Sequence, residues 1–186
     1  MKSQPRRILV AAAGLLAGLT FALGSYAEFS LSKTLAVEFQ AVGPAGLKID
    51  GSGSSLTVTE KDGKVVFVAG LGDLKTGIKK RDEHLKETLA VDKHKQAKLV
   101  VDRSKLKLPG EGEALKDQKV SAQFTLHGTE KTVPVSYDVK RNGSNYAVVG
   151  RTTVNIEEFG IKKPCYLGVC VKPDVKIEVK AVLQDK

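Results

Sequence analysis

The sequence predicts an all-β domain, an antiparallel barrel of about eight strands with one short helix at the barrel end. Apolar and polar residues alternate through most of residues 33–183, which is typical of strands with one buried face. Turn signals such as Asn142-Gly143 join neighbouring runs, as in an antiparallel meander. With one helical segment available, closure into a barrel is the simplest way to cover the apolar faces and remove sheet edges. A two-sheet sandwich is the alternative that the pattern leaves open.

The expected strands follow one another along the chain. In residues 33–42, the apolar side chains of Leu35, Val37, Phe39 and Ala41 are expected to share one face. The other expected strands are residues 47–50, 56–59, 64–69, 97–102, 118–127, 131–140, 146–155 and 174–183.

Residues 72–89 change the apolar period from two to about four and predict the helix. Gly77 follows Thr76 as a turn signal, because glycine tolerates positive φ. Ile78, Leu85 and Leu89 then fall on one helix face. We expect the helix to lie across one end of the barrel, with Leu85 and Leu89 facing the interior.

Three motifs, in this order, resemble those of a known family. They are Asp73, Thr76, Gly77, Arg81, Asp82, His84 and Leu85; then Phe124, Leu126, His127, Gly128, Lys131, Val133, Pro134 and Val135; then Phe159, Gly160 and Ile161 with the closing strand 174–179. The chain resembles the YceI-like family of secreted, lipocalin-like barrels that bind polyisoprenoid and other long-chain lipids. The resemblance spans roughly residues 35–183 and implies a non-enzymatic lipid carrier or storage protein.

The interior of such a barrel either is filled by side chains or holds one small ligand. The inward set is mostly Val, Ala, Leu and Ile, without Trp, and composition alone leaves both readings open. The resemblance implies an open apolar pocket for a polyprenyl phosphate, an isoprenoid quinone or a fatty-acid derivative. The expected pocket residues are Val37, Phe39, Phe67, Leu85, Leu89, Phe124, Leu126, Val135, Tyr137, Phe159, Ile177 and Val179.

Basic residues of the expected helix are candidates for binding a polar head group. Lys79, Lys80, Arg81 and His84 would lie at the pocket mouth, where a phosphate or quinone could meet them. Arg81 could instead pair with a neighbouring carboxylate and pin the helix, and we favour this structural role. A solvated charged face that keeps the protein soluble is the simpler interpretation of the cluster.

Residues 1–27 are expected to be a secretory signal peptide. A basic start precedes an apolar run at residues 8–23, and Ser25 and Ala27 are the small residues before a cut near Ala27. A retained anchor is the alternative, but the run is short for the ~20 residues that span a bilayer. We therefore expect residues 28–186 to form one lipid-binding domain in the periplasm or outside the cell.

The chain carries a formal net charge of +9, of which residues 1–27 contribute three positive charges. A basic surface attracts anionic lipid head groups, pyrophosphate or nucleic acid. Nucleic acid fits poorly, because an exported chain with few aromatic residues has little on which bases can stack. We expect a long-chain lipid or quinone as the partner, with transient contact with a membrane surface, and the sequence leaves homodimer formation open.

The sequence offers little for catalysis. His84 and His94 lack the spacing of a helical metal pair, and His127 stands apart beside a turn. The chain has no Gly-x-Ser-x-Gly elbow and no phosphate-cradling Lys-Ser/Thr loop. We therefore expect no metal, no cofactor and no enzymatic activity.

Cys165 and Cys170 are the two cysteines of the chain. In an exported protein such a pair usually forms a structural disulfide, here in the loop before the last strand. A thiol-redox or other enzyme that uses this pair is the competing functional interpretation. A packed-core surface interaction module is the third.

Overall fold

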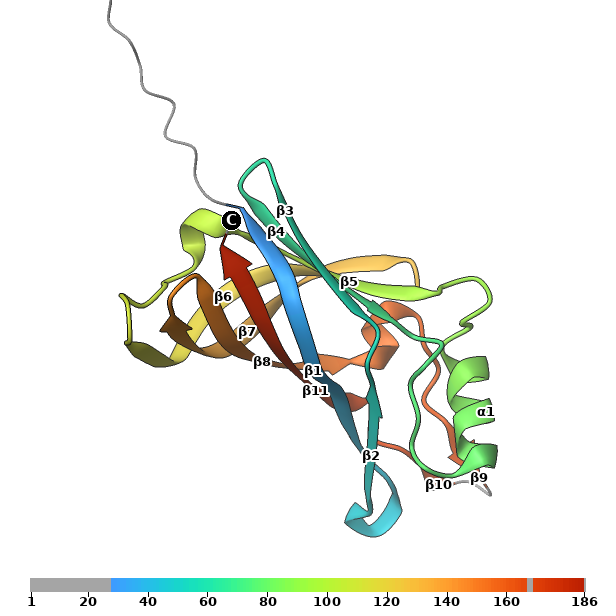
Figure 1. Ribbon diagram of the computed structural model, residues 1–186. Coiled ribbons are helices and arrows are strands. Elements are labelled where there is room, and N and C mark those ends of the chain that lie inside the picture. The colour runs from blue at the N-terminus through green and yellow to red at the C-terminus, as the bar shows by residue number, and fades with distance from the viewer. Residues whose placement is uncertain (1–27, 167–168, 186) are drawn as a thin grey trace, which may run out of the picture.

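The computed structural model describes residues 28–166 and 169–185. The elements are β1 Phe29–Val42, β2 Lys48–Gly53, β3 Leu56–Lys61, β4 Lys64–Gly70, α1 Lys79–Thr88, β5 Gln96–Asp102, β6 Ala114–Leu126, β7 Thr129–Asn142, β8 Asn145–Asn155, β9 Cys165–Tyr166, β10 Val169–Cys170 and β11 Asp174–Asp185. Strands β3 to β8 form a meander in chain order, β11 follows β8, and β1 joins β11 to β3, which closes the ring (Figure 1). The predicted closed antiparallel barrel with one helix is confirmed.

Two short strand pairings lie outside the ring. The hairpin strand β2 pairs with residues 37–42 of β1 and extends the wall beyond the barrel. Strands β9 and β10 form a small ribbon in which Cys165 and Cys170 are bonded, with an S–S distance of 2.01 Å. The predicted disulfide is therefore confirmed. In the described part of the chain, no helix combines the length and apolar character needed to cross a membrane.

The expected inward position of Leu35 is wrong. Strand β1 changes register against β11 between Leu31 and Lys33 and again between Thr34 and Ala36. Each bulge inserts an extra residue and reverses the side-chain alternation at that point. Leu35 is consequently 54% exposed, whereas Val37 beyond the second bulge is buried.

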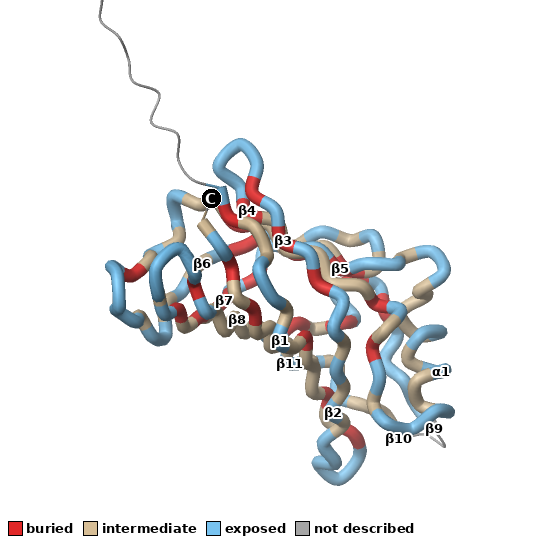
Figure 2. The backbone as a smooth tube through the Cα atoms, viewed as in Figure 1, coloured by how far each residue is buried: buried red, intermediate tan, exposed pale blue. Residues whose placement is uncertain are grey.

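The core is a single cluster on the inner face of the ring. Buried and exposed residues alternate along the strands, as the tube colours show (Figure 2). Val133, Val135, Tyr137 and Val139 of β7 are all buried, while the residues between them are more exposed. The two-residue period read from the sequence therefore assigns this strand correctly.

One end of the barrel is closed by an aromatic and ionic cluster. The Phe29 ring packs edge-on against Tyr146, with centroids 5.2 Å apart, and the Arg103 guanidinium lies 3.6 Å from the Phe29 centroid. The carboxylate of Glu60 accepts hydrogen bonds from Arg103 at 2.9 Å and from the Phe29 backbone N–H at 2.8 Å. Glu60 is the buried charged residue of the described core, and Arg103 supplies its counter-charge.

At the other end, where α1 lies, strands β7 and β8 separate. Their ladder runs from the Asn142–Asn145 pair to the Ser136–Arg151 pair and stops there. Two residues beyond Ser136 lies Pro134, whose carbonyl points toward β8. Proline has no N–H to donate to a ladder. Beyond this point β7 pairs only with β6, and β8 pairs only with β11.

Candidate functional site

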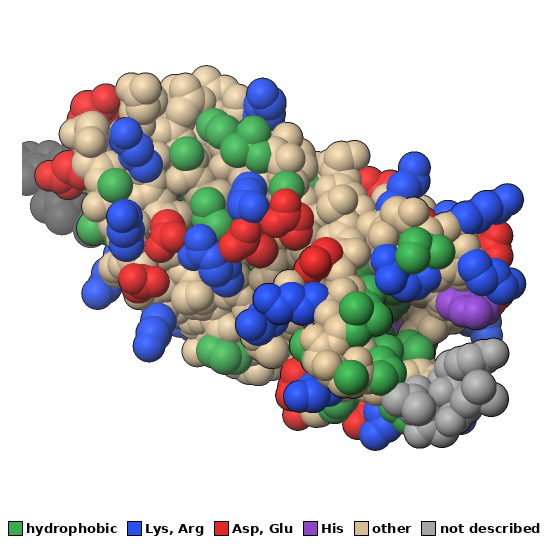
Figure 3. All heavy atoms as spheres, turned by 90° about the horizontal axis from the view of Figure 1, so that it is seen from below, with side chains coloured by type: hydrophobic (Ala, Val, Ile, Leu, Met, Phe, Trp, Pro, Cys, Tyr) green, Lys and Arg blue, Asp and Glu red, His purple; other side chains and the backbone are tan. Residues whose placement is uncertain are grey.

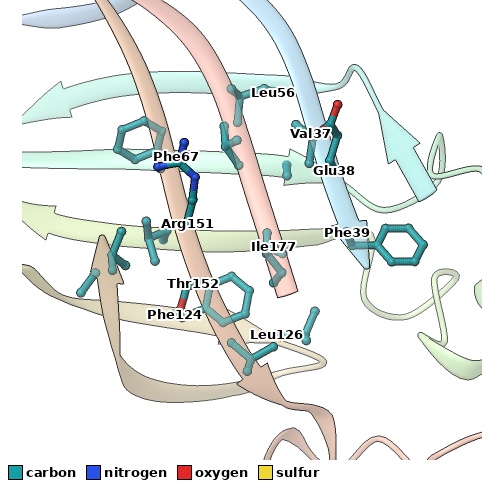
Figure 4. Close-up of a pocket in the computed structure, with 18 of the residues that line it drawn as sticks. Val37, Glu38, Phe39, Leu56, Phe67, Phe124, Leu126, Arg151, Thr152 and Ile177 are labelled. Carbon is teal, nitrogen blue, oxygen red and sulfur yellow. The ribbon is translucent and has the colours of Figure 1, made fainter. Parts of the chain in front are cut away.

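The interior of the barrel holds a cavity of about 270 Å³. Its walls are almost wholly apolar and come from the inner faces of the ring strands, from α1 and from the loops at both ends. Figure 4 shows lining residues of the strands, among them Leu56, Phe124 and Ile177. Ligand pockets for small molecules usually measure about 300–1,000 Å³. The cavity therefore approaches the size of a ligand site, in a place where a packed-core module would have none.

Most of the expected pocket residues are brought together around this cavity. Those that line it are Val37, Phe39, Phe67, Leu85, Leu89, Phe124, Leu126, Val135, Tyr137, Ile177 and Val179. Phe159 is not among the lining residues. It is only 1% exposed and packs edge-on behind the Phe124 ring, with centroids 5.6 Å apart. Phe159 thus supports the wall without facing the cavity.

Helix α1 covers the cavity with its last turn and C-cap. Leu85, Thr88 and Leu89 line the interior from this side. Ile78 was expected on the same face, but that expectation is wrong. It is the extended N-cap residue, before the helical turn begins, and it is 54% exposed.

The start of α1 is held by a hydrogen-bonded cluster around Thr76. The Asp82 carboxylate accepts hydrogen bonds from the Thr76 N–H and hydroxyl. Arg81 donates to the Thr76 hydroxyl and carbonyl oxygens, both at 2.8 Å. The hydrogen bonds from the Thr76 side chain and backbone lower the pKa of Asp82. Arg81 therefore pins the helix, but its partner is Thr76 and not a carboxylate.

None of the four head-group candidates lines the cavity. Lys79, Lys80 and His84 are exposed, and Lys80 lies 3.4 Å from Glu83 in a surface ion pair. Arg81 is engaged with Thr76. Their side of α1 faces away from the apolar lining, so any role in head-group binding stays a prediction.

The segment before α1 is anchored to β2 and to the turn that follows it. Lys75 and Ser52 exchange two backbone hydrogen bonds of 2.8 Å. Asp73 accepts hydrogen bonds from the N–H groups of Ser54 and Ser55 at 2.7 and 2.8 Å. Burial opposes the ionisation of Asp73, but these bonds and the Ser54 hydroxyl outweigh it, so the pKa of Asp73 is lowered.

The loop between β5 and β6 covers the opposite end of the cavity. Leu106 and Leu108 line the interior there. The Tyr137 hydroxyl accepts a 2.8 Å hydrogen bond from the Lys107 N–H and donates one of 3.1 Å to the Lys107 carbonyl. Burial raises the pKa of Tyr137, which keeps the hydroxyl protonated for this contact. Leu106 and Leu108 lie outside every expected strand and the expected helix, so no periodicity in the sequence identified them as lining residues.

Gly150 is a further lining residue that sequence reasoning missed. It lies opposite two inward residues, Tyr137 on β7 and Val179 on β11. A Cβ atom built at Gly150 would meet no atom within 4 Å. Gly150 falls on the inward-facing positions of residues 146–154, and this alternation was the available signal. Because glycine has no side chain, it leaves open space that a larger residue would fill.

The His94 and His127 rings are in contact, with centroids 4.4 Å apart and planes tilted by 50°. Gly128 makes room for this contact, because a Cβ there would lie 3.0 Å from the His94 ring. Among the described residues, no group of three or more His, Cys, Asp or Glu side chains could hold a metal ion. The histidine pair therefore packs the loop between α1 and β5 against the turn between β6 and β7.

The comparisons with known proteins agree with this architecture. The model of the YceI-like domain family matches residues 24–183. No curated protein matches the sequence. A polyisoprenoid binding domain from Saccharophagus degradans, implicated in plant cell wall breakdown, has a similar solved structure. Its TM-score is 0.68 at 14% identity, over 87% of this chain and 100% of that chain.

Two further solved structures share the fold. Burkholderia cenocepacia BcnA matches with a TM-score of 0.59 at 16% identity, over 79% of this chain and 95% of that chain. The YCEI protein of Campylobacter jejuni matches with a TM-score of 0.54 at 10% identity, over 74% of this chain and 85% of that chain. At such low identities the likeness is one of fold.

Proposed function

The chain belongs to the family of YceI-like domains, and from that premise we propose that it binds a long-chain isoprenoid lipid inside its barrel. The candidate ligands are a polyprenyl phosphate or an isoprenoid quinone, with a fatty-acid derivative as the non-isoprenoid alternative. The observation that carries the proposal is the apolar cavity of about 270 Å³ inside the barrel, between α1 and the β5–β6 loop. The name of the Saccharophagus domain, which describes polyisoprenoid binding, supports the same ligand class.

The energetics of such a site favour loose specificity. Each buried methylene contributes about 0.8 kcal/mol, so a chain of ten carbons could bring about 8 kcal/mol before ordering costs. The lining supplies few polar partners that could distinguish one aliphatic tail from another. Affinity should therefore grow with the length of the buried tail until the cavity is full.

The protein would act as a carrier or store and not as an enzyme. The family and its polyisoprenoid-binding relative favour a binding protein. The Cys165–Cys170 disulfide fits an oxidising compartment such as the periplasm or the cell exterior. The predicted signal peptide, residues 1–27, lies outside the described residues, so the proposed export rests on the sequence and the disulfide.

A carrier of this kind must exchange its lipid with a membrane. The start of α1 offers a suitable contact, because exposed Ile78 stands beside exposed Lys79 and Lys80. An apolar tip next to cationic side chains binds anionic bilayers transiently. We include this contact in the proposal.

The proposal is tested by filling the cavity without disturbing its walls. Gly150→Leu places a side chain in open space, so the variant should fold with an unchanged or higher melting temperature. Its affinity for farnesol, measured by displacement of a fluorescent fatty acid, should fall at least about tenfold, because two or more methylenes lose their place.

Val149→Leu is the matched control, since Val149 lies on the outer face of the same strand, paired with Asp138 and Lys180. This variant should bind farnesol like the wild type. A folded Gly150→Leu protein with wild-type affinity would show that the ligand does not occupy the barrel.

A further inference from the structure

A polar groove crosses the outer face of the barrel beside the point where β7 and β8 separate. Cross-strand pairing aligns Lys119, Ser136, Arg151 and Glu178 in one row on strands β6, β7, β8 and β11. All four line the groove, together with Thr153 and Lys176 of the next row. These residues alternate with the inward ones, so the groove lies outside the wall.

The groove and the inner cavity meet at this separation. Val135, Thr152, Ile177 and Phe39 have inward positions, yet they line both the cavity and the groove. Thr152 pairs with Ile177, and Ile177 pairs with Phe39. This row of Thr152, Ile177 and Phe39 lies one residue beyond the Ser136–Arg151 pair, where the β7–β8 ladder ends. No backbone ladder joins the two strands between Val135 and Thr152, and both residues line the two spaces.

Among the described residues, a single side-chain hydrogen bond spans this gap. The Thr152 hydroxyl donates to the Pro134 carbonyl at 2.8 Å. Side-chain rotation can break one such bond at a small cost, whereas a continuous strand ladder opens only cooperatively. The wall should therefore open more easily here than where β7 and β8 are paired.

Two cations that form no ion pair among the described residues flank the gap. None of the ion pairs of the described residues involves Lys119 or Lys176. Arg151, by contrast, is bound to Asp138 at 2.8 Å and to Glu178 at 2.7 Å. Neighbouring strands lie ~4.8 Å apart, so the Cα atoms of Lys119 and Lys176 are roughly 15 Å apart across the gap. Both long side chains can reach a group seated between them, beside the hydroxyls of Ser136 and Thr153.

We propose that the β7–β8 gap is a lateral opening, and that Lys119 and Lys176 bind the phosphate of an anionic isoprenoid lipid whose tail lies in the cavity. This inference rests on the proposed function and specifies the head-group class. It moves the head group from α1 to the outer groove. Figure 3 shows a face with exposed charges of both signs. Basic side chains occur there over the strands as well as at the α1 end, which is consistent with a head-group site away from α1.

The test compares farnesyl phosphate with farnesol on three proteins. The wild type should bind the phosphate more tightly than the alcohol. In Lys119→Ala/Lys176→Ala the affinity for farnesyl phosphate should fall about tenfold, the sum of two weak charge contacts, with farnesol binding unchanged. The control Lys79→Ala/Lys80→Ala removes the cations of α1 and should leave both affinities unchanged.

The outcomes separate this inference from the proposed function. Undiminished phosphate preference in the Lys119/Lys176 variant, or its loss in the α1 variant, would overturn the lateral site. Competition by inorganic phosphate at concentrations equal to those of farnesyl phosphate would assign the groove to free phosphate and overturn the lipid assignment. A wild-type protein that binds neither ligand would instead overturn the proposed function on which the inference rests.

Discussion

The hydroxyl of Thr152 donates a 2.8 Å hydrogen bond to the carbonyl of Pro134, at a place where β7 and β8 are no longer paired. The contact replaces the backbone pairing that proline cannot make. It joins a residue of the cavity lining to the rim of the outer groove. The strength of this contact should therefore govern how readily the wall opens.

Thr152→Val is expected to speed lipid exchange. The substitution keeps the size and branching of the side chain but leaves the Pro134 carbonyl without its partner, which should cost about 1 kcal/mol of stability. The exchange rate of bound farnesol, measured by stopped-flow displacement, should rise. Thr153→Val is the control, because Thr153 lies on the outer face and forms no side-chain hydrogen bond among the described residues. Equal exchange rates in the two variants would argue against a gate at Thr152.

The stability of the barrel end closed by Phe29 and Tyr146 should depend on Arg103. Removing this side chain leaves the Glu60 carboxylate, which is 5% exposed, without its counter-charge. Arg103→Ala should lower the free energy of unfolding in urea by about 3 kcal/mol, as for other broken buried pairs. Lys105→Ala breaks a solvent-exposed pair with Asp102 and should cost less than about 1 kcal/mol. Similar losses in both variants would mean that the cluster around Phe29 is not stabilised by the Arg103 charge.

Asp73 should contribute to the acid sensitivity of the fold. Its folded-state pKa is lowered from 3.8, because the hydrogen bonds from Ser54 and Ser55 outweigh burial. The stability that it contributes is thus fully present above about pH 4 and is lost as the pH falls through the lower folded-state pKa.

Asp73→Asn removes this ionisation and should flatten the decline of the urea midpoint below pH 4 relative to the wild type. Asp50→Asn is a suitable control, since Asp50 is exposed on β2 and accepts one hydrogen bond from Gln40. Parallel curves for wild type and Asp73→Asn would contradict the assignment.

The disulfide is expected to be structural. It closes a loop of only a few residues, so Cys165→Ser/Cys170→Ser should lose about 2 kcal/mol of stability by the chain-entropy estimate. Lipid binding should persist in this variant and in reduced protein, because Cys165 and Cys170 do not line the cavity. Thiol titration of air-oxidised protein should find no free thiol. Two free thiols, or a bridge whose reduction is coupled to turnover, would favour the thiol-redox alternative.

The strands were predictable because their side-chain alternation is a local property. The signal holds wherever the register is regular, as at Val133, Val135 and Tyr137. It failed at Leu35, because a bulge depends on how β1 pairs with β11 and not on β1 alone. It also could not place Phe159, which ends the short 3₁₀ helix Ile156–Phe159 and packs behind Phe124.

The apolar half of the site was more predictable than the polar half. Inward parity identifies the lining of a barrel, but the cations beside an opening depend on which strands separate. Pro134 was visible in the sequence and interrupts a strand ladder. Its consequence required the pairing partners of β7 and β8, since the chain alone does not show that the ladder stops at Ser136–Arg151. Lys119 and Lys176 become neighbours of one gap only in the folded barrel.

Native mass spectrometry of the protein purified from its producing cells, followed by extraction into organic solvent, tests the central claim most directly. The account predicts a bound species that leaves the protein on denaturation and that fragments as a long-chain isoprenoid. Its amount should fall sharply in Gly150→Leu and remain unchanged in Val149→Leu. A wild-type protein that carries no lipid and takes up neither farnesol nor farnesyl phosphate would contradict the account.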